Sequence, residues 1–358
     1  MNKQPWIGQP WADSSFILLP PFISLFIIML FPSLFQDTKG MPEAGWVILV
    51  LLIDVAHVYS TLYRTYFDKS ALRKQRFLLW GIPVAGFIAG MLVYSISSLL
   101  FWRILAYVAV YHFVRQQYGF MRVYSRQETK NRFYTLTDTI TIYAAALYPM
   151  TYWHLNGPRN FSWFIENDFV FFPSAILLQI LTICYYVILA VYIVKEALFV
   201  YTTGTFNIPK TAVITGTIIS WYAGIIYFNG DMAFTLLNVV SHGIPYMALV
   251  WLHGRKQQLR QPGKGGFFLQ LIFSRYGVAL FLLLIFLFAF VEEGLWDVTV
   301  WKEHATIFGT AHLPSLQLSK ELLSIIVPLL ALPQITHYIM DGFIWKIKQE
   351  EFKWSNEI

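Results

Sequence analysis

Long apolar segments follow one another along almost the whole chain, and short stretches that hold most of the charged residues separate them. Each segment approaches the ~20 residues that a helix needs to cross the hydrocarbon core of a bilayer. Within such a helix the backbone polar groups bond to one another, so the segment tolerates lipid. We predict about ten spans: Phe16–Phe35, Ala44–Tyr66, Phe77–Leu99, Leu100–Met121, Phe133–Trp153, Val170–Ala197, Ile208–Phe228, Met232–His253, Val278–Glu292 and Leu322–Lys346.

The basic residues predict the orientation of these spans. Every even-numbered span is followed by a basic segment, whereas the intervening loops are poor in Lys and Arg or mixed in charge. Because cytoplasmic loops carry an excess of Lys and Arg, both termini are expected in the cytoplasm. The basic residues that mark the cytoplasmic ends are Lys69, Arg73, Lys74, Arg76, Arg122, Arg126, Lys130, Arg132, Lys195, Lys210, Arg255, Lys256, Arg260, Lys264, Lys346, Lys348 and Lys353.

Composition strengthens the membrane assignment. The 358 residues are 57% hydrophobic and only 13% charged, about half the charge of an ordinary soluble domain. A soluble multidomain protein and a disordered chain are therefore excluded. The predicted fold class is an all-α integral membrane protein of the bacterial inner or plasma membrane type, with residues 1–358 forming a single polytopic bundle. The loop 295–319 is expected to lie on the outer membrane surface.

The charge distribution and the cysteine content limit the chemistry. The net charge of +6 is spread over short loops, which indicates membrane lipids rather than nucleic acid as the partner of the basic residues. Cys184 is the single cysteine and lies in an apolar run. The chain therefore has no internal disulfide and no cysteine-based metal site, and any metal must be bound by histidines and carboxylates.

Four of the eight histidines fall inside predicted spans that run toward the cytoplasm. His57, His112 and His337 stand seven, ten and nine residues before the basic residue that ends each span. That spacing places them at a common depth of roughly 10–15 Å, and His242, thirteen residues before Arg255, lies about one turn deeper. We expect the other four histidines to face solvent: His154, His253, His304 and His312.

Each of these buried histidines has a polar companion one helical turn away. Such neighbours lie on the same face of a helix, as in bundle sites where carboxylate and imidazole project inward together. The pattern predicts a transition-metal site of one or two ions, most simply iron because the surroundings are apolar. His57, His112, His242, His337, Asp54 and Asp341 are the candidate ligands, and Gln116, Asn238 and Asp138 are candidate supporting residues.

Two arginines lie near the same depth. Arg64 stands seven residues after His57, and Arg115 three residues after His112. They are candidates for holding the head group or carboxylate of a lipid substrate. Pairing with nearby aspartates, or extension toward the interface, explains them equally well.

Three other functions fit the same histidines. A proton- or cation-coupled transporter would use them as a relay, although the matching broken helices typical of such carriers are not evident. A haem protein would use pairs of histidines as axial ligands. Polar side chains also join membrane helices without any further function.

Short segments of the chain resemble the bacteriorhodopsin-related-protein-like (Brp/Blh) β-carotene dioxygenases. The resemblance rests on Asp54-Val55-Ala56-His57, His112-Phe113 and Pro333-Gln334-Ile335-Thr336-His337. It implies an integral-membrane iron enzyme that cleaves a carotenoid. The chain departs from the family where a His-x-x-x-His pair is expected, since Tyr246 follows His242. The predicted function is an iron-dependent membrane oxygenase or oxidoreductase acting on a lipid, carotenoid or isoprenoid, with an unidentified electron donor.

Overall fold

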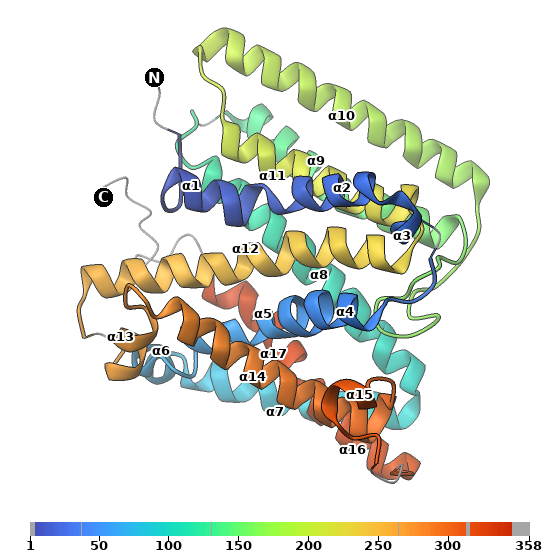
Figure 1. The fold of residues 1–358 in the computed structure, drawn as a ribbon. Helices are drawn as coiled ribbons and strands as arrows, with labels where there is room; N and C mark the ends of the chain where they lie inside the picture. Colours follow the sequence, from blue (N-terminus) through green and yellow to red (C-terminus); the bar gives the residue numbers. More distant parts are fainter. Residues whose placement is uncertain (1–3, 37, 130, 264, 313–315, 346–358) are drawn as a thin grey trace. The chain divides into compact units, whose positions relative to one another are not determined.

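The computed structural model describes residues 4–36, 38–129, 131–263, 265–312 and 316–345, and within them it is all-helical, without a β-strand (Figure 1). The predicted all-α class is thus confirmed. All ten predicted spans fall on helical segments. The basic residues Lys130, Lys264, Lys346, Lys348 and Lys353, and part of the predicted surface loop, lie outside the described residues.

Contacts divide the chain into two compact units, which we describe separately. Unit 1 comprises Met1–Met41, Val110–Pro245 and Trp345–Ile358, and unit 2 comprises Pro42–Ala109 and Tyr246–Ile344. Two of the four boundaries fall inside long helices, α8 (Ser98–Tyr124) and α12 (Asp231–Arg260). The single domain predicted from the sequence stays a prediction.

Unit 1 contains the first and the middle helices of the chain. Within it α9 packs against both α10 and α11, and α11 packs against α2. Its helical segments, besides its parts of α8 and α12, are α1 (Pro10–Asp13), η1 (Ser14–Leu18), α2 (Pro20–Leu30), α3 (Pro32–Phe35), α9 (Arg132–Leu155), α10 (Ala175–Thr203), α11 (Ile208–Trp221) and η4 (Tyr222–Tyr227).

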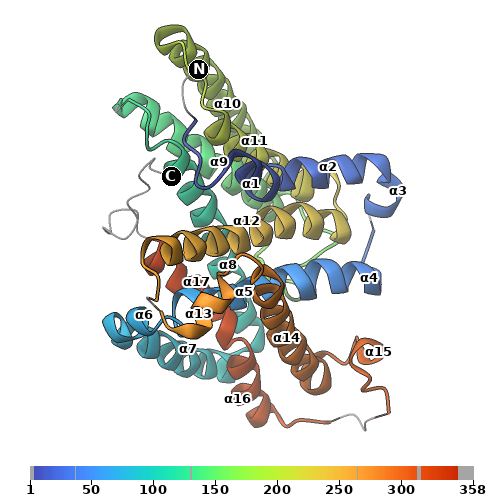
Figure 2. The ribbon, with the colours of Figure 1, turned by 60° about the vertical axis from the view of Figure 1, so that its left-hand side comes forward.

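Unit 2 contains the remaining helices. In it α7 runs beside α16 and α17, while α14 packs on α5 and η2 (Figure 2). Its segments, besides its parts of α8 and α12, are α4 (Glu43–Trp46), η2 (Val47–Val55), α5 (Ala56–Ser60), η3 (Thr61–Arg64), α6 (Lys69–Lys74), α7 (Arg76–Ile96), α13 (Phe267–Ile272), α14 (Val278–Trp296), η5 (Asp297–Trp301), α15 (Ala305–Phe308), α16 (Lys320–Leu330) and α17 (Leu332–Ile344).

Local sequence signals explain where the longest helices begin and end. Ser174 caps α10 by accepting a hydrogen bond from the Leu177 N–H, as N-cap serines do. The same helix ends at Gly204, whose φ of 64° suits a residue without a Cβ. Asn207 caps α11 in the same way through the Lys210 N–H. Only Ser97, with extended backbone, separates α7 from α8, as expected from the near-absence of a loop between the third and fourth predicted spans.

Among the described residues, five helices are long and apolar enough to cross a membrane, and up to seven if each of two bent helix pairs forms one span. The remaining three predicted spans fall on α8, α9 and α11. In α8, Arg103, His112 and Arg115 interrupt the apolar sequence. Much of the apolar surface is exposed: only 11% of the most apolar window of α7, and the same share in α10, is buried. Such surfaces fit contact with lipid.

The ninth span is longer than the sequence predicts. The sequence predicts an end at Glu292, but α14 and η5 form one helical run from Val278 to Trp301. The reason is that Glu292 and Glu293 are buried, 5% and 9% exposed, so these carboxyl groups do not mark a solvated loop. The first part of the predicted surface loop 295–319 is consequently helical.

Candidate metal centre

His57 lies deep in unit 2, on the helical run formed by α4, η2, α5 and η3. The segment Val47–Val55 is π-helical, a form that is frequent at functional sites. His57 follows it and is 1% exposed. Its Nδ1 lies 3.3 Å from the Ile53 carbonyl oxygen. A carbonyl can only accept, so this bond places the ring proton on Nδ1 and the lone pair on Nε2.

His337 lies beside His57 in the same unit. It belongs to α17, which packs against α5, and its ring centroid is 5.0 Å from that of His57, with the ring planes at 79°. Its Nδ1 is 2.6 Å from Thr61 Oγ1. Thr61 Oγ1 is also 3.0 Å from Tyr246 Oη. The Thr61 hydroxyl thus bonds to His337 and links it to the phenol of Tyr246.

His112 and His242 form the corresponding pair in unit 1. They come from α8 and α12, are 2% and 0% exposed, and their Nε2 atoms are 3.1 Å apart. The His242 ring is stacked on Phe113, with centroids 3.6 Å apart and planes at 8°. This stacking, together with the edge-to-face contact of the two histidine rings, limits the orientation of the His242 imidazole.

A proline shapes the part of α12 that carries His242. Pro245 has no N–H and so leaves the Ser241 carbonyl, four residues earlier, without its intrahelical donor. Gln117 Nε2 donates to that carbonyl at 3.2 Å. Gln116 Nε2 donates to the His242 carbonyl at 2.9 Å. Two neighbouring amides of α8 thus hold α12 at the histidine.

The four buried histidines form one group. His57, His112, His242 and His337 are all buried, and as a group they could hold a metal ion. Uncharged imidazoles are suitable ligands for iron, zinc, copper or nickel. The identity of the metal does not follow from the ligands alone.

The spacing within the His112–His242 pair indicates how it would bind. Imidazole nitrogens bind a metal at about 2.0–2.1 Å, so ligands at about 90–110° to one another stand roughly 3.0–3.4 Å apart, while opposite ligands stand about 4 Å apart. The observed 3.1 Å fits neighbouring ligands. The same 3.1 Å is also a hydrogen-bonding distance, so the two rings could share one proton or supply two nitrogens to one ion.

The predicted companions differ in where they lie. Asp54 Oδ1 is 3.8 Å from His57 Nδ1, and the Asp54 side chain is 38% exposed. The group of four does not include Asp54 or Asp341. Asn238 donates to the Phe234 carbonyl of its own helix. Of the supporting residues, only Gln116 bonds to the backbone of a predicted ligand.

Asp138 lies in a separate ionic network of unit 1. It accepts hydrogen bonds from Lys195 and Lys210, and Lys210 Nζ is also 2.8 Å from Glu128 and 2.7 Å from Glu196. Both lysines are 1% exposed. Three carboxylates therefore compensate the charge of these two lysines inside the unit.

The two arginines occupy different surroundings. Arg115 donates to Tyr143 Oη at 2.7 Å and lies over the Tyr118 ring, so its guanidinium is held by aromatic neighbours. Arg64 Nη2 lies 3.5 Å from the Ile344 carbonyl. Their role toward a substrate head group stays a prediction.

Sequence reasoning missed other polar groups of unit 2. Glu292 Oε1 accepts from Gln334 Nε2 at 2.6 Å and from Trp296 Nε1 at 3.3 Å. His253, expected at the surface, is only 8% exposed. Phe273 covers that end of α12, since its ring lies where a side chain on Gly254 would project.

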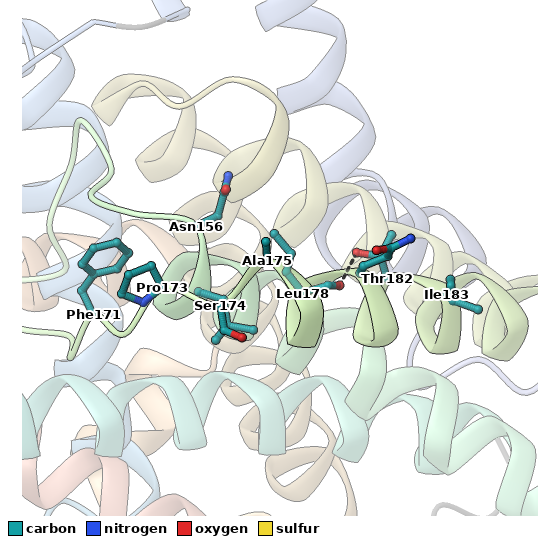
Figure 3. A pocket seen from close by; sticks show the side chains of 10 residues that line it. Asn156, Phe171, Pro173, Ser174, Ala175, Leu178, Thr182 and Ile183 are labelled. Atoms are coloured by element: carbon teal, nitrogen blue, oxygen red, sulfur yellow. Dashed lines mark hydrogen bonds between the residues drawn. The ribbon is translucent and has the colours of Figure 1, made fainter.

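A cavity of about 620 Å³ lies in unit 1 at the start of α10 (Figure 3). Apolar and uncharged polar side chains line it: Leu155, Asn156, Phe171, Pro173, Ser174, Ala175, Leu178, Gln179, Thr182 and Ile183. These residues include no histidine and no carboxylate, so this cavity is not the candidate metal centre.

Comparisons with protein-family models, with curated proteins and with solved structures found no match to this chain. The resemblance to the β-carotene dioxygenases therefore stays a prediction from short segments.

Proposed function

We propose that this protein is a metal-dependent membrane oxidoreductase, in the first instance an iron oxygenase, that acts on a lipid, carotenoid or other isoprenoid. The observation that supports the proposal is the group of four buried histidines on helices of apolar sequence. Bound iron would supply oxygen activation at the site. The chain would supply four imidazoles, hold them in place through Phe113 and Gln116, and exclude water through its apolar surroundings.

We further propose the full topology of ten membrane spans with both termini in the cytoplasm. The helical structure of all ten predicted segments supports it, as does the placement of basic residues after even-numbered spans. Cys184 is the single cysteine of the chain. In a Cys184→Ala background, single cysteines placed in successive loops and labelled from one side of the membrane would show alternating access. Two consecutive loops labelled from the same side would contradict this topology.

Metal analysis tests the proposed site. The full-length protein, purified in detergent and loaded anaerobically with Fe²⁺, should retain one or two metal ions per chain. His57→Ala and His337→Ala should lose most of this metal, whereas His312→Ala, at an exposed position, should retain it. A wild-type protein without stoichiometric transition metal, or histidine variants that keep all of it, would show the proposal to be wrong.

Oxygen consumption tests the reaction class. With β-carotene in detergent micelles, the iron-loaded protein should consume oxygen and produce a cleaved or oxygenated product, and His112→Ala should not. A haem protein would instead show strong visible absorption after purification. Proton-coupled transport would be detected as a pH change inside proteoliposomes without oxygen uptake, and either result would replace the oxygenase proposal.

A further inference from the structure

The hydroxyl of Thr61 connects two buried side chains of unit 2. Its Oγ1 lies 2.6 Å from His337 Nδ1 and 3.0 Å from Tyr246 Oη. Thr61 is 5% exposed, His337 1% and Tyr246 0%. A hydroxyl has a single proton to donate. Thr61 therefore donates to at most one of these two partners, whereas its oxygen can accept from either or both.

The direction of the hydrogen bond between Thr61 and His337 determines the tautomer of His337. In one direction His337 Nδ1–H donates to Thr61, and Thr61 O–H donates to Tyr246; the lone pair of the ring then lies on Nε2. In the other direction Tyr246 donates to Thr61, and Thr61 donates to Nδ1, which places the ring proton on Nε2. A metal binds the nitrogen that carries the lone pair, so Nε2 is a ligand only when Nδ1–H donates to Thr61, whichever way the Thr61–Tyr246 bond runs.

His57 shows the contrast. Its Nδ1 faces the Ile53 carbonyl, an acceptor that admits only one tautomer. His337 Nδ1 faces a hydroxyl that is able to donate or accept. The tautomer of His57 is thus set by the backbone, and that of His337 is set by two side chains.

Tyr246 is also placed to hold the histidine rings. Its ring centroid is 4.9 Å from that of His337, at 88°, and 5.9 Å from that of His57, at 78°. These edge-to-face contacts limit ring rotation. The phenol therefore contributes both a hydrogen-bonding atom to the chain and a packing surface for the two imidazoles.

We propose that Thr61 and Tyr246 are positioning residues that hold His337 in the Nδ1–H tautomer and direct Nε2 toward the metal. The proposal rests on the proposed function only in taking His337 as a ligand. Partners of this kind, one step away from the metal, commonly change metal affinity by about 10- to 100-fold.

The tautomer is measured in the metal-free protein labelled with ¹⁵N-histidine. The ring signals of His337 are assigned by their loss in His337→Asn. Wild type should show a protonated Nδ1, Thr61→Val should show a shift of population toward protonated Nε2, and Thr61→Ser should restore the wild-type state. Thr65→Val is the matched control, because Thr65 lies one turn further on and its hydroxyl bonds only to the Thr61 carbonyl among the contacts seen.

Affinity is measured with Co²⁺, whose visible spectrum reports its binding. Thr61→Val should weaken binding about 10- to 100-fold, Thr61→Ser should restore it, and Tyr246→Phe should cause a smaller loss. Tyr63→Phe is the control for the phenol. Tyr63 is similarly buried, but its hydroxyl donates to the Phe281 carbonyl, so its loss should lower stability without changing Co²⁺ affinity.

The outcomes separate this inference from the proposed function. An unchanged His337 tautomer in Thr61→Val, or failure of Thr61→Ser to restore it, overturns the inference. The expected tautomer changes in a protein that binds no transition metal would support the role of Thr61 and contradict the metal-dependent function. Normal Co²⁺ binding without any oxygenase reaction would leave the inference supported and the reaction class wrong.

Discussion

Gln117 donates its side-chain N–H to the Ser241 carbonyl across 3.2 Å, at the carbonyl that Pro245 leaves without an intrahelical donor. The Gln117 amide of α8 therefore replaces the backbone donor that Pro245 lacks in α12. One residue later, His242 enters the metal centre. The chain thus places a helix irregularity beside a candidate ligand and satisfies it with a specific side chain.

Replacing Gln117 by Leu should destabilise the protein by about 1–3 kcal/mol, since it leaves a buried carbonyl without a donor. The same change in a Pro245→Ala background should cost much less, because the alanine backbone can supply the missing N–H. Thermal unfolding of the four proteins measures this coupling. Equal costs in the two backgrounds would show that Gln117 acts through something other than the Ser241 carbonyl.

Metal binding should stabilise the folded protein. Co²⁺ at about 100 times its dissociation constant should add ~2.7 kcal/mol, and a chelator should remove that gain. His112→Ala and His242→Ala should unfold at the same temperature with and without Co²⁺. His312→Ala should retain the full metal-dependent shift. A shift that survives in the first two variants would place the bound metal elsewhere.

The lysine network of unit 1 should be sensitive to the loss of a single charge. Lys210→Met removes one partner each of Glu128, Glu196 and Asp138, and Asp138 and Glu196 then keep Lys195. Because the carboxylates remain buried, the expected cost is about 3–5 kcal/mol. Lys320→Met, at an exposed helix start, should change stability by less than about 1 kcal/mol. Similar unfolding temperatures for the two variants would contradict a buried ionic network.

Two glycines of unit 2 should respond to alanine in opposite ways. A Cβ on Gly254 would lie 2.2 Å from the Phe273 ring, so Gly254→Ala should destabilise the protein by about 1–3 kcal/mol. Gly342 in α17 has open space around it, and Gly342→Ala should stabilise the helix by about 0.5–1 kcal/mol. Unfolding measurements on both variants check the pair, and a neutral Gly254→Ala would contradict the close packing of Phe273.

The positions of the helices could be predicted because the bilayer imposes a length and an apolar composition on each span. The four buried histidines could be singled out because an imidazole in an apolar span requires a partner, and their role as metal ligands stays a proposal. Their similar distance from the basic span ends added the common depth. These signals lie within single segments and need no knowledge of how helices pack.

The missed features all depend on contacts between distant parts of the chain. Thr61 lies four residues after His57, on the same face, but its bond to His337 joins residues far apart in sequence. Lys210 resembles a loop residue until its carboxylate partners are located. Glu292 likewise resembles the end of a span until its bonds to Gln334 and Trp296 are located. Hydropathy registers the cost of a buried charge and not the partner that offsets it.

The length of α10 relates the ionic network to the thickness of the membrane. Its 29 residues extend about 43 Å, whereas the hydrocarbon core measures about 30 Å. With one edge of the core at Ala175, as the proposed topology allows, about 30 Å of helix ends at Lys195. The lysine–carboxylate network would then lie at head-group level, where charges are solvated more easily. A bilayer with longer acyl chains has a thicker hydrocarbon core. It would either surround the network with hydrocarbon or reduce the tilt of α10 relative to the bilayer normal. Stability of this protein should therefore depend on lipid chain length.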